Sequence, residues 1–411
     1  MPQIKPDIET FAKIKVVGVG GSGGSAVDRM VKTNIRGVDF VAMNTDVQAL
    51  HHNSAENKLH IGKTITRGLG AGMDPEMGKR SAEEARNEIR EVLKDSNMVF
   101  ITCGLGGGTG SGASPVIAEI AREVGALTVA VVTKPFGFEG PQRKAIAEQA
   151  YEELARKVDT IITIPNDRVL QIIDKKTSLL EAFKIVDDVL RQGVQGISEL
   201  ITVPGLINVD FADVKSIMSD TGSALMGIGY GTGENRAVEA AKAAISSPLL
   251  ELSIEGAKGI LFTITGGTNL GMQEVSEAAE IITEKTDKNV KVIFGTVIDE
   301  SMGDDIRITV IATGFEDRER KAIMPDNIDI NGAYTGKKSF YPTSIFTKKN
   351  TPKIEEKIVM EEDEEEDDDV VGVFNKKPLE TVKIEEKKKD DNNADEEDLE
   401  IPAFIRKKMG L

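Results

Sequence analysis

The residues with the clearest chemical meaning form a glycine loop at 104–112, which reads Gly-Leu-Gly-Gly-Gly-Thr-Gly-Ser-Gly. The loop follows an apolar run, 98–103, that predicts a buried strand, and it precedes a helix predicted to start at Pro115. Because glycine has no Cβ atom, backbone N–H groups can approach a phosphate closely, and the helix dipole favours its negative charge. This order of elements therefore predicts a phosphate-binding site rather than a flexible linker.

A second glycine-rich loop follows the strand predicted over 14–19. One glycine of this strand and two of the loop fit the G-x-G-x-x-G spacing of dinucleotide-binding folds: Gly18, Gly20 and Gly23. Asp46, after the strand predicted over 40–44, stands where such folds place an acid for the ribose. This segment alone fits an NAD-dependent enzyme. The loop at 104–112 favours a nucleotide with more phosphate, because one pyrophosphate needs only one such loop.

Polar residues that can bind a nucleoside come later in the chain. Glu139 and Arg143 follow the apolar strand predicted over 126–133, at the strand end where α/β proteins place ligands. Glu139 can bond a ribose hydroxyl, and Arg143 can meet a phosphate or the ribose. Taken alone, both residues are better explained as surface charges.

The helix predicted over 178–201 carries Phe183 and Asp187, which are four residues apart and share one face. A carboxylate can accept both N1–H and N2–H of guanine, whereas adenine has no such donor pair, and a phenyl ring can stack on the base. Asn166, after the strand predicted over 159–165, can bond the edge of the base. A bidentate base contact discriminates by roughly 1–3 kcal/mol in DNA recognition. Periodicity alone favours a core position for Phe183 and a solvated charge for Asp187.

Three polar residues form an N-x-D-x-x-D pattern at the start of another predicted helix: Asn208, Asp210 and Asp213. Asp210 suits the N-cap of that helix, and Asp213 suits the positive end of its dipole. An acid pair can also position and polarise water for phosphoryl transfer with Mg²⁺. The residues by themselves leave both interpretations open.

Composition excludes several classes of protein. The 411 residues are 40% hydrophobic, which is enough for two ordinary domains. A single cysteine excludes a disulfide framework and fits a reducing cytosol. The three histidines, all between positions 51 and 60, argue against a metal cluster or a histidine-dependent triad. No apolar run approaches the length of a membrane span, so we expect no direct membrane insertion.

Acidity is concentrated near the C-terminus. The net charge of the chain is −17, and residues 352–398 carry 20 acidic against 8 basic residues, or −12, which leaves about −5 elsewhere. No basic face is evident, so we expect no nucleic-acid partner. The dense charge over 316–398 predicts a disordered linker.

Strands and helices alternate along the chain, which predicts a doubly wound α/β domain, a long central helix and a second α/β domain. The loop 68–73 precedes a helix predicted over 75–93, with Asp74 as its N-cap. In the second domain we expect helices at 237–245 and 271–283, and strands at 259–265, 291–297 and 306–312.

Two further glycine motifs are interpreted as structural. Residues 62–64, Gly-Lys-Thr, look like the end of a P-loop, but position 57 is asparagine where that motif needs glycine. Lys63 is therefore expected at the surface. Residues 266–270, Gly-Gly-Thr-Asn-Leu, are expected to form a strand-to-helix turn.

Residues 106–112 match the signature loop of the tubulin/FtsZ family of GTPases. The chain resembles this family, above all its bacterial cell-division members, from about Ile14 to Phe315 and again at its C-terminus. The resemblance implies a tubulin-like fold that binds GTP or GDP, with Mg²⁺ held through the phosphates. It also implies GTP hydrolysis coupled to head-to-tail self-assembly, in a cytoplasmic ring at midcell on the inner face of the membrane.

The resemblance divides the chain into six parts: a flexible N-terminus (1–12), a GTP-binding domain (13–177), a connecting helix (178–203), a polymerisation domain (204–315), the acidic linker (316–398) and a partner-binding peptide (399–411). It makes Asn208, Asp210 and Asp213 catalytic in the nucleotide site of the next subunit. It assigns GTP binding to the following residues: Gly20, Gly21, Ser22, Gly23, Gly24, Ser25, Asn44, Ala71, Gly72, Gly104, Gly106, Gly107, Gly108, Thr109, Gly110, Thr133, Glu139, Arg143, Asn166, Phe183 and Asp187.

After the charged linker, the last residues of the sequence again include large apolar side chains, followed by a basic cluster. This pattern is typical of a short peptide that folds into the groove of a partner. The resemblance implies membrane-anchoring and regulatory division proteins as partners. The residues expected to bind them are Leu399, Ile401, Pro402, Phe404, Ile405 and Arg406.

Two other functions remain compatible with parts of the chain. An NAD-dependent oxidoreductase would use the first glycine loop, but the sequence offers no obvious catalytic histidine or tyrosine set for hydride transfer. A non-catalytic, nucleotide-gated scaffold would use Asp210 and Asp213 only as helix caps.

Deleting residues 399–411 should leave self-assembly intact and abolish binding to membrane anchors, because a disordered linker separates this peptide from the predicted domains. Sedimentation of the truncated protein with GTP measures assembly, and a pull-down with the anchor measures binding. A truncated protein that no longer sediments would contradict the role of 316–398 as a tether.

Overall fold

A computed structural model describes residues 12–170, 177–203, 205–247, 254–284, 286 and 290–315. Ten described strands form one mixed sheet in the order β3-β2-β1-β4-β5-β6-β7-β10-β8-β9. The predictions for the N-terminal segment up to residue 11, the linker 316–398 and the peptide 399–411 lie outside the described residues.

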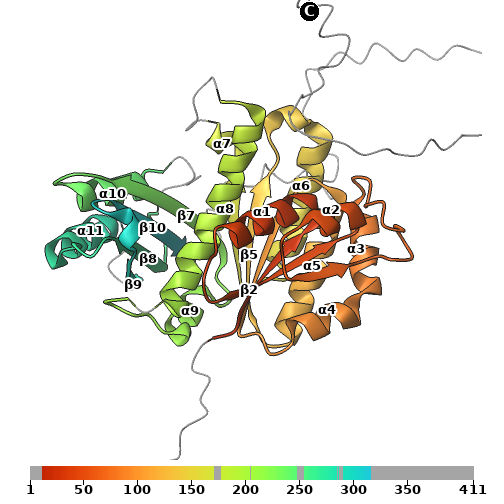
Figure 1. Cartoon of the computed structure of the whole chain (residues 1–411), viewed down its shortest axis with the longest axis horizontal. Coiled ribbons are helices and arrows are strands. Elements are labelled where there is room, and N and C mark those ends of the chain that lie inside the picture. Colours follow the sequence, from red (N-terminus) through yellow and green to blue (C-terminus); the bar gives the residue numbers. More distant parts are fainter. Residues whose placement is uncertain are drawn as a thin grey trace, which may run out of the picture. The chain divides into compact units, whose positions relative to one another are not determined.

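Six parallel strands make the first part of the sheet, in the doubly wound order 3-2-1-4-5-6. They are β1 (Ile14–Val19), β2 (Val38–Asn44), β3 (Asn57–His60), β4 (Met98–Gly104), β5 (Leu127–Lys134) and β6 (Thr160–Pro165). The central strands β4 and β5 are mostly apolar and are buried up to their last residue because helices cover both faces (Figure 1). The strand order reverses between β1 and β4, which is where doubly wound sheets bind ligands.

Two sets of helices cover the two faces of these strands. One core packs the sheet against α1 (Gly20–Lys32), α8 (Leu179–Thr202) and α9 (Phe211–Met218). The other core packs the opposite face against four helices: α3 (Pro75–Glu84), α4 (Arg86–Leu93), α5 (Gly108–Glu123) and α6 (Pro141–Ala155). Three short elements complete this half: α2 (Val47–His52), η1 (Gly137–Glu139) and α7 (Asn166–Val169).

The second half extends the sheet beyond β6. Its elements are β7 (Gly222–Gly231), α10 (Arg236–Ile245), β8 (Gly259–Gly266), α11 (Met272–Glu284), β9 (Lys291–Ile298), η2 (Glu300–Met302) and β10 (Ile306–Thr313). β7 runs parallel to β6 and antiparallel to β10, which pairs antiparallel with β8, and β8 pairs parallel with β9. A third core lies between this part of the sheet and α10 and α11. The α/β fold class predicted from the sequence is confirmed.

Three helix boundaries differ from the predictions. α5 begins at Gly108 and α1 at Gly20, so glycines expected in loops are helical, and Pro115 lies inside α5 instead of at its start. Tertiary packing outweighs the low helix propensity of glycine at these positions. The helix expected over 75–93 divides at Ala85 into α3 and α4, while the N-cap at Asp74 is confirmed by its bond from the Glu76 N–H.

The strand β7 was not predicted, because its four glycines resemble a loop. The structure explains two of them. A Cβ atom at Gly229 would lie 2.0 Å from the carbonyl oxygen of Ala240, and one at Gly231 would lie 1.9 Å from that of Arg236. Glycine is therefore required so that α10 can lie directly against this strand.

The same kind of contact joins α3 to α5. A Cβ atom at Gly112 would lie 1.8 Å from the carbonyl oxygen of Pro75, and one at Gly78 would lie 2.4 Å from that of Gly108. These contacts bring the two helix backbones together next to the glycine loop.

Replacing Gly112 by alanine should destabilise the fold by about 1–3 kcal/mol, because the added methyl group would force α3 and α5 apart. Denaturant unfolding of Gly112→Ala measures this loss. Gly271→Ala is the matched control, since its nearest neighbour, Glu274 Oε2, would be at an ordinary 3.5 Å. Equal midpoints for the two variants would contradict the packing argument.

Candidate functional site

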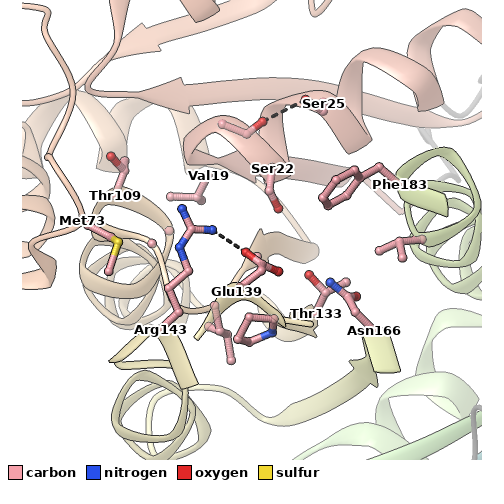
Figure 2. A pocket seen from close by; sticks show the side chains of 18 of the residues that line it. Val19, Ser22, Ser25, Met73, Thr109, Thr133, Glu139, Arg143, Asn166 and Phe183 are labelled. Carbon is pink, nitrogen blue, oxygen red and sulfur yellow. Dashed lines mark hydrogen bonds and ion pairs between the residues drawn. The ribbon is translucent and has the colours of Figure 1, made fainter. Parts of the chain in front are cut away.

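A pocket of about 430 Å³ lies at the carboxyl ends of the parallel strands (Figure 2). It is lined by Val19, Gly21, Ser22, Ser25, Ala71, Gly72, Met73, Gly104, Leu105, Gly107, Gly108, Thr109, Gly110, Thr133, Pro135, Glu139, Arg143, Asn166, Phe183, Val186 and Asp187. The two glycine loops, the loop 68–73, the 135–143 segment and α8 all contribute, so the fold brings together segments far apart in the sequence.

The glycine loops meet where α1 and α5 begin. Neither helix has a side-chain N-cap bond or an acidic residue in its first turn, so their first N–H groups are left for another acceptor. Close packing holds both helices in place: a Cβ atom at Gly23 would lie 2.2 Å from the carbonyl oxygen of Thr102. Two helix N-termini that face one pocket suit an anion such as a polyphosphate.

Glu139 and Arg143 lie together at the side of the pocket, and Figure 2 shows the Arg143 guanidinium paired with the Glu139 carboxylate. Glu139 also accepts a hydrogen bond of 2.8 Å from the Phe136 N–H, which fixes the short turn η1. The pairing with Glu139 holds the Arg143 guanidinium, at the start of α6, beside the pocket. This arrangement can present Arg143 to a phosphate or ribose.

An aromatic side chain, Phe183, lines the pocket where α8 borders it. Phe183 is 40% exposed and packs edge-on against the buried ring of Phe136 at 5.5 Å between centroids. Asn166 is buried, and its Oδ1 atom has no hydrogen-bond partner among the described residues. A planar ligand that stacks on Phe183 and donates to Asn166 would satisfy both groups.

Asp187 lies beside Phe183 on α8, and its Oδ2 atom pairs with the Arg29 guanidinium of α1 at 3.1 Å. Burial raises the pKa of Asp187 to about 6, and the positive charge of Arg29 opposes part of that rise. The carboxyl group is therefore mostly ionised near neutral pH, and the N–H donors of guanine would stabilise the ionised form.

Most residues assigned to GTP binding from the sequence line this pocket, and five do not. Gly20, Gly24 and Asn44 line an adjoining pocket of about 370 Å³ between α1 and α2. Gly23 is buried against Thr102, and Gly106 takes a left-handed φ of 97° in the loop. Five lining residues were missed: Val19, Met73, Leu105, Pro135 and Val186. Val19, Met73, Leu105 and Val186 are adjacent in sequence to a predicted residue, and Pro135 is two residues from Thr133, so proximity in sequence was the available signal.

Asn208, Asp210 and Asp213 are not among the residues that line either pocket. All three are exposed. Asp210 caps α9 by accepting from the Asp213 N–H at 2.8 Å, and Asn208 accepts from the Gly205 N–H at 2.6 Å. Within its own subunit, this loop stands apart from the nucleotide-sized pocket.

Three other motifs have structural roles here. Asp46 caps α2 by accepting hydrogen bonds from the Gln48 and Ala49 N–H groups. Its carboxylate therefore has a structural role in place of the ribose contact that an NAD site would need. Lys63 is exposed and paired with Glu88, as predicted. The buried thiol of Cys103 has its pKa raised to about 11 and is no nucleophile.

Comparisons with known proteins agree with this site. The family model described as Tubulin/FtsZ family, GTPase domain, matches residues 13–174, and that described as FtsZ family, C-terminal domain, matches 222–316. An empty FtsZ dimer from M. jannaschii is 46% identical with a TM-score of 0.72, over 74% of this chain and 89% of that one. A mutant FtsZ from M. jannaschii is also 46% identical, with a TM-score of 0.73, over 75% of this chain and 93% of that one.

A GDP-bound CetZ1 monomer from Haloferax volcanii shares the fold, at 21% identity and a TM-score of 0.67, over 76% of this chain and 97% of that one. Fold and site together define a tubulin-like GTPase. The chain belongs to the FtsZ family of GTP-binding cytoskeletal filament proteins. The expected bacterial origin stays a prediction, since the FtsZ structures matched here come from an archaeon.

GTP affinity should fall as the pH drops below about 6, by up to about ten-fold per pH unit. The Asp187 pKa is about 6 in the free protein, and only the ionised carboxylate can accept two guanine donors. Fluorescent-nucleotide titrations between pH 5 and 8 measure this dependence.

Asp187→Asn is the control, because it keeps the titration of the nucleotide phosphates and removes that of the carboxyl group. The GTP affinity of this variant should be lower than that of the unmodified protein at pH 7.5. It should not show the further decrease below pH 6 that the Asp187 carboxyl group causes. Identical pH curves for the two proteins would exclude Asp187 from base recognition.

Proposed function

We propose that the chain assembles head to tail with copies of itself and hydrolyses GTP at the junction. Asn208, Asp210 and Asp213 of one subunit complete the nucleotide site of the next. One observation carries this proposal: both carboxylates that line the pocket, Glu139 and Asp187, are paired with arginines. Among the residues that the structure describes, the pocket therefore has no carboxylate free to position water.

The loop before α9 offers the missing groups. Within the described part of the chain, the Asp213 carboxylate makes no hydrogen bond or ion pair, and it is exposed. Hydrolysis needs a water held in line with the γ-phosphorus and an acceptor for its proton. The water oxygen bonds to phosphorus while the bond to the β–γ bridging oxygen breaks, and GDP leaves with that oxygen. In our proposal Asp213 accepts the proton and Asp210 helps to orient the water.

Exposed apolar side chains support a heterologous contact. Leu69 is 88% exposed and Phe138 is 64% exposed, and both lie in segments that line the nucleotide pocket. On the second half of the chain, Leu206 is 71% exposed, next to the catalytic loop, and Met272 is 78% exposed. Two different apolar faces on one chain can pair between copies, and a contact of this kind that does not close gives a filament.

Magnesium is implied by the family, and the side chains present fit an ion held mainly by the nucleotide. Among the described residues no group of three or more His, Cys, Asp or Glu side chains is placed to hold a metal. The hydroxyls of Ser22 and Thr109 line the pocket at the glycine loops and can complete the coordination of an ion bound by phosphates. Such an ion would neutralise charge on the phosphates, while the chain's N–H groups hold them.

The family supports a role in cell division, as a cytokinetic ring on the inner face of the cytoplasmic membrane. We propose that membrane-anchoring and regulatory division proteins bind the peptide 399–411, which lies outside the described residues. None of the described helices has the length and apolar character needed to cross a membrane.

Asp213→Ala should leave GTP binding by dilute protein near normal and lower GTP turnover by about a hundred-fold or more. The reason is that Asp213 would act only in the pocket of a neighbouring subunit. Nucleotide titration and phosphate release measure the two properties separately, and Glu91→Ala, an exposed acid on α4, serves as control.

For the unmodified protein, turnover per subunit should rise with protein concentration together with light scattering. Turnover that stays constant on dilution would contradict a shared active site, and so would loss of GTP binding as the main defect of Asp213→Ala.

A further inference from the structure

Arg29, on the helix α1, pairs with the carboxylate that is expected to recognise guanine, although Arg29 does not line the nucleotide pocket. Its Nη2 atom lies 3.1 Å from Oδ2 of Asp187 on α8. Of the two neighbouring pockets, Asp187 lines the nucleotide pocket and Arg29 lines the one between α1 and α2. Arg29 can therefore influence a bound base through Asp187 without touching the base itself.

The pair leaves part of the Asp187 carboxylate available. Within the described part of the chain, this is the only hydrogen bond that the side chain of Arg29 or of Asp187 makes. Oδ1 of Asp187 is therefore left for a donor on the base, and Oδ2 keeps a second lone pair for another. The neighbouring Asp188 has partners of its own, since it accepts from Arg191 Nε at 2.6 Å and from Gln192 Nε2 at 2.5 Å.

Packing alone does not explain an arginine at position 29. Its Nε atom is buried and has no hydrogen-bond partner among the described residues. A buried donor without an acceptor is unfavourable, and apolar residues in place of a buried ion pair often give equal or greater stability. The helices α1 and α8 already contribute apolar side chains, such as Met30 and Leu190, to one core. The ion pair with Asp187 is the better explanation of the guanidinium.

The charge of Arg29 acts on the ionisation of Asp187. Burial raises the pKa of Asp187 to about 6, and among the described residues Arg29 is the one charged group that opposes this rise. The other charged side chains on the surrounding elements are Asp28 and Lys32 on α1, Lys184, Asp188 and Arg191 on α8, Asp167 and Arg168 on α7, and Glu139 and Arg143 across the pocket. Without Arg29, the Asp187 carboxyl group would be protonated nearer to neutral pH.

We propose that Arg29 is a positioning residue for guanine recognition, which orients the Asp187 carboxylate and keeps it ionised with one oxygen left for the base. The inference rests on the nucleotide site of the proposed function, and in particular on recognition of guanine by Asp187. A guanidinium is planar and directs its hydrogen bonds, whereas an ammonium supplies mainly a point charge. Orientation and charge are therefore two separate contributions of Arg29.

The orientation of the carboxylate can be measured by the preference of dilute protein for GTP over inosine triphosphate (ITP). Inosine lacks the 2-amino group of guanine, so it offers Asp187 one donor in place of two. We expect a preference of about ten-fold in the unmodified protein. In Arg29→Met the preference should fall below about three-fold at pH 8.0, where the carboxyl group is still mostly ionised.

The charge can be measured by the pH dependence of GTP affinity. Its midpoint, near pH 6 in the unmodified protein, should move upward by about one pH unit in Arg29→Met, because burial of Asp187 is no longer opposed. Arg29→Lys should restore the midpoint, since it returns the positive charge, but not the full preference for GTP over ITP. Lys32→Met is the matched control: it removes an exposed cation of α1 that pairs with Asp28, and it should change neither property.

An unchanged midpoint together with an unchanged GTP-to-ITP ratio in Arg29→Met would overturn the role of Arg29, even if overall affinity falls, because a structural defect weakens both nucleotides equally. If Arg29→Met does not fold, Arg29→Lys decides, and a GTP-to-ITP ratio equal to that of the unmodified protein would overturn the proposal. Asp187→Asn with the pH dependence and base preference of the unmodified protein would instead overturn recognition of guanine by Asp187.

Discussion

Close backbone contact of α1 with the strand β4, and of α5 with the helix α3, is the constraint on which the rest of the structure depends. Gly23 lets α1 approach Thr102, and Gly112 lets α5 lie against α3. As a result the uncapped starts of α1 and α5 face one pocket where the strand order reverses. A phosphate supplies the acceptors that these helix starts lack, so packing and nucleotide binding rely on the same glycines.

The other end of the pocket depends on burial instead of backbone N–H groups. Burial disfavours the ionised form of Asp187, and the positive charge of Arg29 offsets part of that effect. The helix α8 extends about 22 Å beyond Asp187 to its last residue, Thr202. The loop that contains Asn208 follows. One helix thus carries Asp187, the residue expected to recognise the base, and leads into the loop that we assign to the nucleotide site of the next subunit.

In the proposed function, this division of groups would link hydrolysis to assembly. The pocket is lined by the starts of α1 and α5 and by two arginine-paired carboxylates, whereas Asp213 is exposed in the first turn of α9 and does not line the pocket. A separated subunit can then hold GTP with little hydrolysis, and the covering subunit would bring both the water-positioning groups and the exclusion of solvent. The exposed leucines at 69 and 206 would be covered only when subunits meet.

The sequence by itself determined the α/β class, nearly all strands and the residue types of the nucleotide site, because strand runs, glycine spacing and the Phe183–Asp187 step are local patterns. Tertiary structure decided what depends on contacts between distant segments. Glycines at 108–112 become helical because α3 packs on them, glycine-rich β7 is a strand because α10 lies against it, and Asp46 is a helix cap. That Asp213 does not line the pocket of its own subunit is also a tertiary property, since sequence spacing does not report which surface an exposed side chain faces.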